Sequence, residues 1–171
     1  LRGDPIKTEA SFIPDEDGHA YAVDLVKQVV DLNSGEYIDK DLQNASPTNF
    51  SIGVAGYPEK HFEAPNMKND LKFLKQQIDT GDDYIVTQLF YDNEKFKSFV
   101  DQCRKEGITV PIIPGIKPIS TKKQILALPK FFHIDLPDEL VDAIENAKDA
   151  EAVKQVGIDW AIKQTKDLID F

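Results

Sequence analysis

The sequence has very few of the residues that build disulfide frameworks and metal centres. It contains one cysteine, Cys103, and three histidines among 171 residues. A single cysteine cannot form an internal disulfide, and a lone thiol fits a reducing compartment. Scattered histidines with one cysteine do not make a metal-ligand set. We therefore predict no disulfide and no metal site, and we expect a cytoplasmic protein.

Positive charge and long apolar runs are scarce as well. Lysine and arginine total 20 against 30 aspartates and glutamates, which gives a formal net charge of −10. Binding of nucleic acid needs a cationic surface, and a membrane helix needs about 20 consecutive apolar residues. The sequence therefore predicts neither partner. Its hydrophobic content of 41% is typical of a globular domain.

What the chain does have is an alternation of short apolar runs and amphipathic segments. The runs at 50–57, 83–91 and 110–116 are nearly continuous, as in buried parallel strands. Helices are predicted between and after them, at 20–32, 66–81, 92–107, from Ser120 onward, and from Pro129 to the end as 136–147 and 149–171. Asp92 and Ser120 are the predicted caps of their helices. The polar stretch 33–49 is predicted to be a surface insertion.

The spacing of these strands predicts an α/β fold with a parallel sheet buried on both sides. No G-x-G-x-x-G follows any strand, which disfavours the open dinucleotide-binding sheet and favours a barrel. A complete (β/α)8 TIM barrel takes about 250 residues. We therefore expect residues 1–171 to form its C-terminal half, with about half the strands. The opening LRGD would be the end of a strand already under way, so we expect an internal fragment whose open edges associate.

Polar residues near the ends of the expected strands are the candidates for chemistry. Asp4 follows Arg2-Gly3, and its alternatives are an ordinary loop acid or an adhesion tripeptide. Tyr57 and His61 lie in a proline-bounded loop before a helix, where a surface histidine is the alternative. Gln88 interrupts an apolar strand, as either a recognition amide or a structural one.

The remaining candidates add little chemistry of their own. IIPGIKP at 112–118 indicates backbone shaping, Gln124 lies on a helix, and Cys103 is predicted to be buried core. No nucleophilic triad can be assembled from this sequence. One acid, one amide and aromatic residues suggest that a cofactor supplies the difficult chemistry.

Four blocks in order, LRGD, VAGYPEKHFEA, TQLFYD and IIPGIKPIS, resemble the methylenetetrahydrofolate reductase family. The resemblance covers nearly the whole chain and implies a (β/α)8 barrel that binds FAD non-covalently. It also implies ping-pong chemistry, in which NAD(P)H reduces the flavin and the flavin reduces methylenetetrahydrofolate to methyltetrahydrofolate. This reaction belongs to one-carbon and methionine metabolism, and family members are commonly homo-oligomers.

The resemblance also implies roles for individual residues. Asp4 would be the catalytic carboxylate near flavin and pterin, and it would bind substrate together with Gln88 and Gln124. The implied FAD contacts are Arg2, Gly3, Asp4, Tyr21, Ala22, Tyr57, His61, Ala64, Asp70, Gln76 and Gln77.

Two positions depart from the family pattern. Gln77, preceded by Gln76, stands where the family often has a lysine near the FAD phosphates. Lys72, Lys75 or the N-terminus of the helix would have to compensate for the missing cation. Asp82 stands where a small apolar residue is common.

Two alternatives to a reductase remain open. One is a non-catalytic partial barrel that keeps some FAD and folate contacts, and the other is an unrelated barrel with another cofactor. The family's acid would precede Leu1, so we expect no turnover from residues 1–171 alone.

Overall fold

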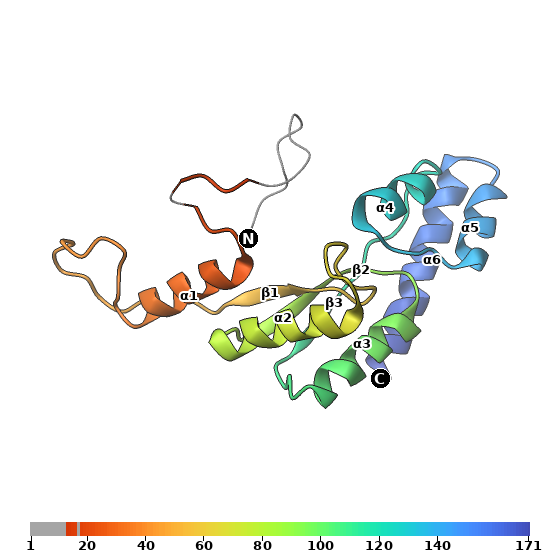
Figure 1. Ribbon diagram of the computed structural model, residues 1–171. Coiled ribbons are helices and arrows are strands. Elements are labelled where there is room, and N and C mark those ends of the chain that lie inside the picture. The colour runs from red at the N-terminus through yellow and green to blue at the C-terminus, as the bar shows by residue number, and fades with distance from the viewer. Residues whose placement is uncertain (1–12, 17) are drawn as a thin grey trace.

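The structure is a computed structural model that describes residues 13–16 and 18–171 (Figure 1). Its strands are β1 (Gly53–Gly56), β2 (Tyr84–Leu89) and β3 (Ile112–Gly115). Its helices are α1 (Ala22–Asn33), α2 (Met67–Thr80), α3 (Asn93–Lys105), α4 (Gln124–Phe132), α5 (Asp138–Glu145) and α6 (Ala150–Ile169). In the described residues, no helix combines the length and hydropathy needed to span a bilayer.

The three strands form one parallel sheet in the order β1-β2-β3. Val54 pairs with Ile85, and Ile85 pairs with Ile112. Helices connect the strands, as parallel pairing requires. The predicted α/β fold with part of a parallel sheet is therefore confirmed, and each strand is shorter than its apolar run.

The prediction that both faces of the sheet are buried is wrong for the described chain. Burial alternates along β1, and on β2 Ile85 is fully buried while Val86 is 43% exposed. Ile113 on β3 is 47% exposed. Because the described helices cover only one face, alternate side chains of these apolar strands remain open to solvent.

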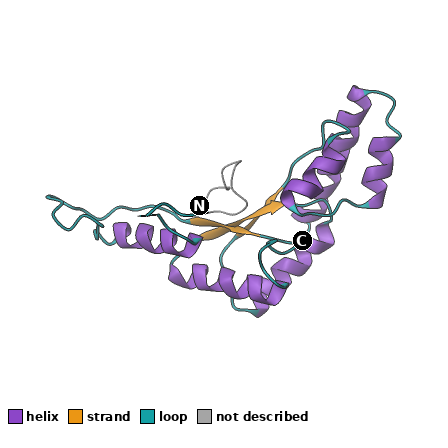
Figure 2. Cartoon of the chain, turned by 45° about the horizontal axis from the view of Figure 1, so that its top comes forward, coloured by secondary structure: helices purple, strands orange, loops and turns teal. Residues whose placement is uncertain are grey.

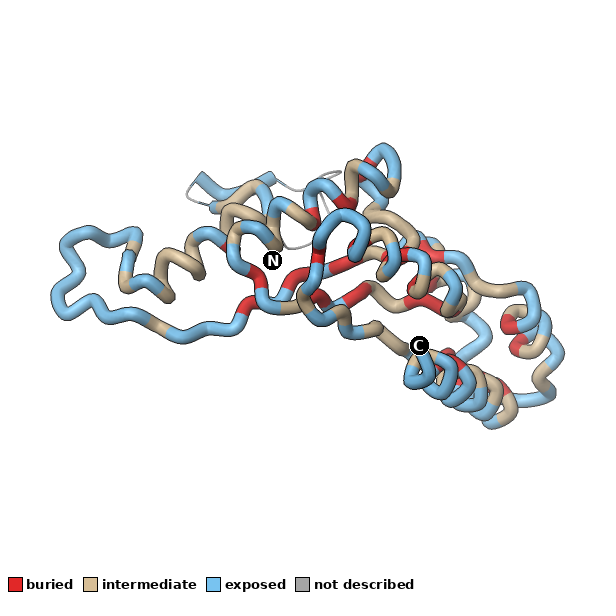
Figure 3. Tube along the Cα trace, turned by 90° about the horizontal axis from the view of Figure 1, so that it is seen from below, coloured by how far each residue is buried: buried red, intermediate tan, exposed pale blue. Residues whose placement is uncertain are grey.

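The covered face holds the first of two hydrophobic cores. It joins Val54 and Ile85 of the sheet to α1, α2 and α3, and Phe99 and Cys103 of α3 are almost completely buried. Figure 3 shows the buried residues gathered along the strands and the inner sides of these helices. The prediction that Cys103 is core is confirmed.

The second core lies among α4, α5 and α6, beyond the carboxyl ends of the strands (Figure 2). It includes Leu128, Leu140, Ile144 and Val153. α6 passes so close to the backbone of Ile119, which precedes α4, that a Cβ on Gly157 would collide with the carbonyl oxygen of Ile119. Glycine is therefore required there by close packing.

The helix ends confirm one predicted cap and correct two other predictions. Asp92 caps α3, and its carboxylate accepts the Glu94 N–H at 2.9 Å. Ser120 is not the cap of α4, because a turn over 121–123 comes first and the helix begins at Gln124. The chain is also not continuously helical from Pro129. Helix α4 continues through Pro129 to Phe132 and is capped by His133, whose φ is 52°, and residues 133–137 contain no helix. The stretch 34–52 forms an extended loop without helix or strand (Figure 2).

Candidate functional site

The carboxyl ends of the parallel strands meet at one edge of the sheet, where ligands of α/β folds bind. The β1–α2 loop (residues 57–66) begins at this edge and leads back into α2 (Figure 1). Gln88 lies near the end of β2 at the same edge.

The β1–α2 loop brings two predicted site residues into contact. The rings of Tyr57 and His61 meet edge to face, with centroids 4.6 Å apart. Between them Lys60 has a φ of 76°, an uncommon conformation for a residue with a side chain. Its ammonium group donates to the carbonyl oxygens of His61 at 3.0 Å and Ala64 at 2.7 Å. These two bonds hold the loop in a tight fold, with Ala64 buried.

Asp70, in the first turn of α2, holds the same loop from the helix. Its carboxylate accepts the backbone N–H of His61 at 2.8 Å. Burial raises the pKa of Asp70, although the hydrogen bond from His61 and the neighbouring positive charges oppose that rise. The structure thus brings together Tyr57, His61, Ala64 and Asp70, four of the residues implied by the resemblance.

A shallow pocket joins this loop to β2 and to the end of α4. Its lining residues are Tyr57, Pro58, Glu59, Lys60, Gln88, Leu89, Phe132, His133 and Ile134. Gln88 is partly buried, and its side-chain oxygen accepts the N–H of Leu89 at 2.9 Å. That bond satisfies the acceptor oxygen of the Gln88 amide within its own strand.

Aromatic rings extend from the loop to the end of α4. The ring centroid of Phe62 lies 4.7 Å from that of His61. Phe62 also stacks on His133, with ring centroids 4.8 Å apart and an interplanar angle of 23°. His133 can reach this position because it ends α4 in the left-handed conformation. Sequence reasoning missed both Phe62 and His133, and its only available signal was their aromatic character.

An ion pair of the buried Glu59 side chain at this edge was also missed. Glu59 in the loop accepts from the Lys95 ammonium at 2.6 Å, and Lys95 also contacts Asp135 at 2.6 Å. The Asp135 N–H donates to the same Glu59 oxygen at 2.9 Å. Glu59 is adjacent to predicted residues in GYPEKHFEA, but nothing in the sequence pairs it with Lys95.

Other predicted residues lie apart from this group. Gln76 and Gln77 are in the later turns of α2, about 14–15 Å along the axis from its first residue by helix geometry. Tyr21 precedes α1, where its backbone N–H bonds the Asp24 carboxylate, and Ala22 is the first helical residue. The Gln124 side-chain oxygen accepts the backbone N–H groups of residues 120 and 121 at the start of α4. Arg2, Gly3 and Asp4 lie outside the described residues.

In the described part of the chain, no group of three or more His, Cys, Asp or Glu side chains could hold a metal ion. The polar and aromatic groups at the carboxyl edge are suited to binding an organic ligand. They offer ring faces, a carboxamide and hydrogen-bonding backbone.

Comparison with known proteins identifies the family. A model of the family described as methylenetetrahydrofolate reductase matches residues 1–171. The chain belongs to the methylenetetrahydrofolate reductase family. The resemblance found in the four sequence blocks is therefore confirmed.

Curated relatives agree with this assignment over nearly the whole chain. Methylenetetrahydrofolate reductase 2 of Saccharomyces cerevisiae is 39% identical over 99% of this chain. Methylenetetrahydrofolate reductase (NADH) 1 of Arabidopsis thaliana is 41% identical, again over 99%. The chain spans about a quarter of these relatives, 27% and 28% of their length. It spans 50% of 5,10-methylenetetrahydrofolate reductase of Pectobacterium carotovorum, which is 34% identical.

A solved structure supports the fold alone. It is an uncharacterized protein from Clostridium thermocellum, described as binding two copies of 5-methyl-5,6,7,8-tetrahydrofolic acid. The TM-score is 0.59 at 19% identity, and the match covers 98% of this chain and 54% of that one.

Proposed function

We propose that this chain is part of an FAD-dependent enzyme that reduces methylenetetrahydrofolate to methyltetrahydrofolate with NAD(P)H. The observation that carries the proposal is the family match over all 171 residues, with relatives named as NADH- and NADPH-dependent reductases. The grouping of Tyr57, His61, Ala64 and Asp70 at the carboxyl edge supports it.

The described residues fit a flavin at this edge. The uncovered face of the sheet leaves alternate side chains of β1, β2 and β3 open beside the loop that bears Tyr57 and His61. The residues that would hold FAD are Tyr57, His61, Ala64 and Asp70 here, with Arg2, Gly3, Tyr21, Ala22, Gln76 and Gln77 from elsewhere in the chain. When bound, FAD supplies a ring system that accepts and then donates a hydride.

The chain's own groups bind and orient the substrates. The Gln88 carboxamide has two donors and one acceptor, which suits the edge of a heterocycle. We assign it to binding folate and nicotinamide in turn, with Gln124 on the substrate side. The Asp4 carboxylate would accept a hydrogen bond from the pterin and stabilise positive charge as the methylene bridge opens.

The larger assembly forms a second part of the proposal. We propose that chain beyond these residues completes a (β/α)8 barrel over the open face of the sheet. We further propose a cytoplasmic homo-oligomer that supplies methyl groups for methionine synthesis. The alternative function is a non-catalytic partial barrel that retains only some FAD and folate contacts. The exposed Val86 and Ile113 favour this alternative for residues 1–171 alone.

The direct test uses the full-length protein that carries this chain. A flavin absorbance spectrum is recorded first, followed by oxidation of NADH and of NADPH with and without methylenetetrahydrofolate. We expect bound flavin and folate-dependent oxidation. A colourless protein without such activity would overturn the proposal.

A matched pair of variants then tests the substrate role of Gln88. Gln88→Ala should raise the KM of both substrates, by about tenfold for a lost hydrogen bond that leaves a polar group unpaired. Gln155→Ala, on the exposed surface of α6, should change neither KM. Equal kinetics for the two variants would remove Gln88 from the site.

A further inference from the structure

Glu59, Lys95 and Asp135 form a bridge among three segments that are far apart in the sequence. Lys95 lies in the first turn of α3, while Asp135 lies between α4 and α5. The Lys95 ammonium bonds the Glu59 and Asp135 carboxylates, each at 2.6 Å, and the Asp135 N–H donates to Glu59 at 2.9 Å. One carboxylate oxygen of Glu59 thus holds both a helix and the backbone of a loop.

The two arms of the bridge differ in burial. The Glu59 side chain is only 8% exposed, whereas Asp135 is 82% exposed and Lys95 is 31% exposed. Exposed pairs contribute little, and a buried carboxylate depends strongly on its partner. The Glu59–Lys95 contact is therefore the arm that holds the segments together.

The charge state of the bridge favours this arrangement. Partial burial of Lys95 opposes its charge, but hydrogen bonds to Asp135 and Glu59 outweigh that effect and raise its pKa. The hydrogen bond from Lys95 lowers the pKa of Asp135. Both shifts favour the charged forms of Lys95 and Asp135 at neutral pH.

The second oxygen of Glu59 has an unusual environment. Oε1 is buried and has no hydrogen-bond partner among the described residues. Such an oxygen is destabilising unless water or a ligand donates to it. Among the described residues, Glu59 is therefore held by the contacts of its other carboxylate oxygen, Oε2, alone.

Glu59 lies between Tyr57 and His61, the two rings that meet at the edge of the sheet. Lys60 and Asp70 hold the His61 side of the loop through its backbone. On the other side, Glu59 connects the loop to α3 and to the chain that follows His133. The loop is therefore fixed from both sides of its aromatic pair.

We infer that Glu59 is a positioning residue, which acts through Lys95 and Asp135 to fix Tyr57 and His61 for cofactor binding. This inference rests on the proposed function for its consequence in catalysis. Its structural part concerns only the order of the loop. Small displacements of groups that position a ligand can reduce a rate or an affinity by tenfold or more.

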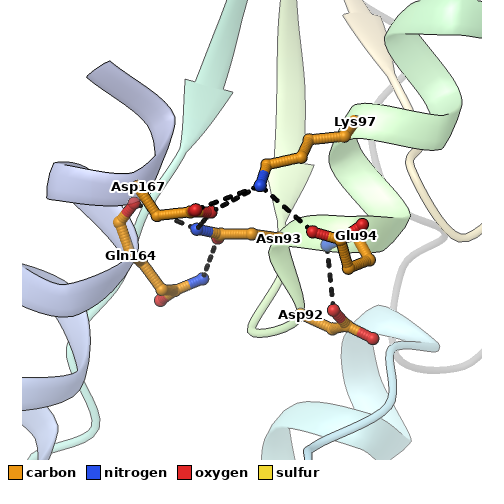
Figure 4. A network of polar contacts seen from close by, with 6 residues as sticks. All are labelled: Asp92, Asn93, Glu94, Lys97, Gln164 and Asp167. Atoms are coloured by element: carbon orange, nitrogen blue, oxygen red, sulfur yellow. Dashed lines mark hydrogen bonds and ion pairs between the residues drawn. The ribbon is translucent and has the colours of Figure 1, made fainter. Parts of the chain in front are cut away.

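Two neighbouring lysines offer a matched comparison in the full-length protein. Lys95 and Lys97 both lie on α3 and both bridge two carboxylates, but Lys97 bonds Glu94 of its own helix and Asp167 of α6 (Figure 4). Lys95→Met and Lys97→Met remove the same charge from the same helix. Lys95→Arg tests rescue by a residue that keeps the charge, and Glu59→Gln keeps the shape of the acceptor.

Two readouts are measured for each variant. Amide hydrogen exchange of residues 57 and 59–61, relative to the amides of β2, reports the order of the loop without reference to catalysis. Flavin dissociation constants and the separate KM and kcat values report its consequence. We expect Lys95→Met to accelerate loop exchange and weaken flavin binding, each by about tenfold. Glu59→Gln should act in the same direction, Lys95→Arg should restore both readouts, and Lys97→Met should change neither.

The outcomes separate this inference from the proposed function. Equal effects of Lys95→Met and Lys97→Met would overturn the positioning role, because general destabilisation would explain both. If Lys95→Met does not fold, normal exchange and flavin affinity in Glu59→Gln would overturn it. A wild-type protein without flavin would overturn the proposed function, and loop exchange would still decide whether Glu59 orders the loop.

Discussion

Two buried carboxyl groups lie at opposite ends of the same sheet and have different surroundings. Glu59 follows β1 at the carboxyl edge and bonds Lys95 and a backbone N–H. Asp82 precedes β2 at the amino edge, is 5% exposed, and neither of its oxygens has a hydrogen-bond partner among the described residues. Burial, with a smaller contribution from the charge of Asp83, raises the pKa of Asp82 to about 7.

The difference shows how a buried acid is tolerated in each place. At the carboxyl edge the Lys95 ammonium group compensates the charge of Glu59, and this ion pair joins segments that bear the candidate site. At the amino edge no cation among the described residues compensates the charge of Asp82, and burial instead raises the pKa of this carboxyl to about 7. The first acid connects segments, while the second costs stability whenever it is ionised.

The largest expected effect comes from removing the cation at the carboxyl edge. Lys95→Met should lower the free energy of unfolding by about 2–3 kcal/mol, because it leaves Glu59 buried without its ion-pair partner. Urea denaturation of the full-length protein measures this change. Lys97→Met serves as the control and should leave the midpoint nearly unchanged, because its partners are exposed. A similar loss in both variants would remove the contrast between the two sites.

The second prediction concerns the amino edge. The folded pKa of Asp82 is above its ordinary value of 3.8, so the folded state binds the extra proton between about pH 4 and pH 7. Its contribution to stability therefore falls as pH rises through that range and is lowest above pH 7. Asp82→Asn should stabilise the protein by about 1–3 kcal/mol at pH 8, and the gain should disappear near pH 4. Unfolding curves at both pH values decide this, and a gain independent of pH would contradict it.

A smaller effect is expected at Asp83, which lies next to Asp82 but is well bonded. Its carboxylate accepts the Ile52 N–H at 2.8 Å and the Ser51 hydroxyl at 2.9 Å. Asp83→Asn should cost about 1 kcal/mol through these bonds. It should also lower the pKa of Asp82, because the neighbouring negative charge is gone. An NMR titration of the Asp82 carboxyl measures that shift, and an unchanged pKa would assign the whole effect to burial.

The smallest effect is predicted for Cys103, in the core beneath the sheet. Its thiol is fully buried, and burial raises its pKa to about 12. We expect no reaction with thiol reagents in the folded protein and full reaction in urea. Rapid labelling under native conditions would show that the core opens locally.

The sequence was sufficient to predict the three strands and the aromatic pair of the β1–α2 loop. Apolar runs identify parallel strands, and Tyr57 and His61 are only four positions apart, so the loop itself brings them together. The contacts of Glu59 could not be predicted in this way, because Lys95 and Asp135 are 36 and 76 residues from it. Only the folded chain places them side by side.

Two errors of the sequence analysis have physical causes. Apolar runs do not reveal whether helices cover one or both faces of a sheet, so the exposure of Val86 and Ile113 was not foreseen. Pro129 was expected to mark a boundary, yet α4 continues past it because proline removes only one backbone donor from a short helix. The αL conformation of His133, four residues later, provides the actual stop.

The order of the sheet has a consequence for how the protein opens. β2 has a paired strand on each side, whereas β1 and β3 each have one neighbour among the described residues. Backbone amides of β2 should therefore have the slowest exchange, and protection should decrease toward both outer strands. The β1–α2 loop extends from one of these outer strands, so the segment that carries the aromatic pair can loosen while the centre of the sheet stays intact.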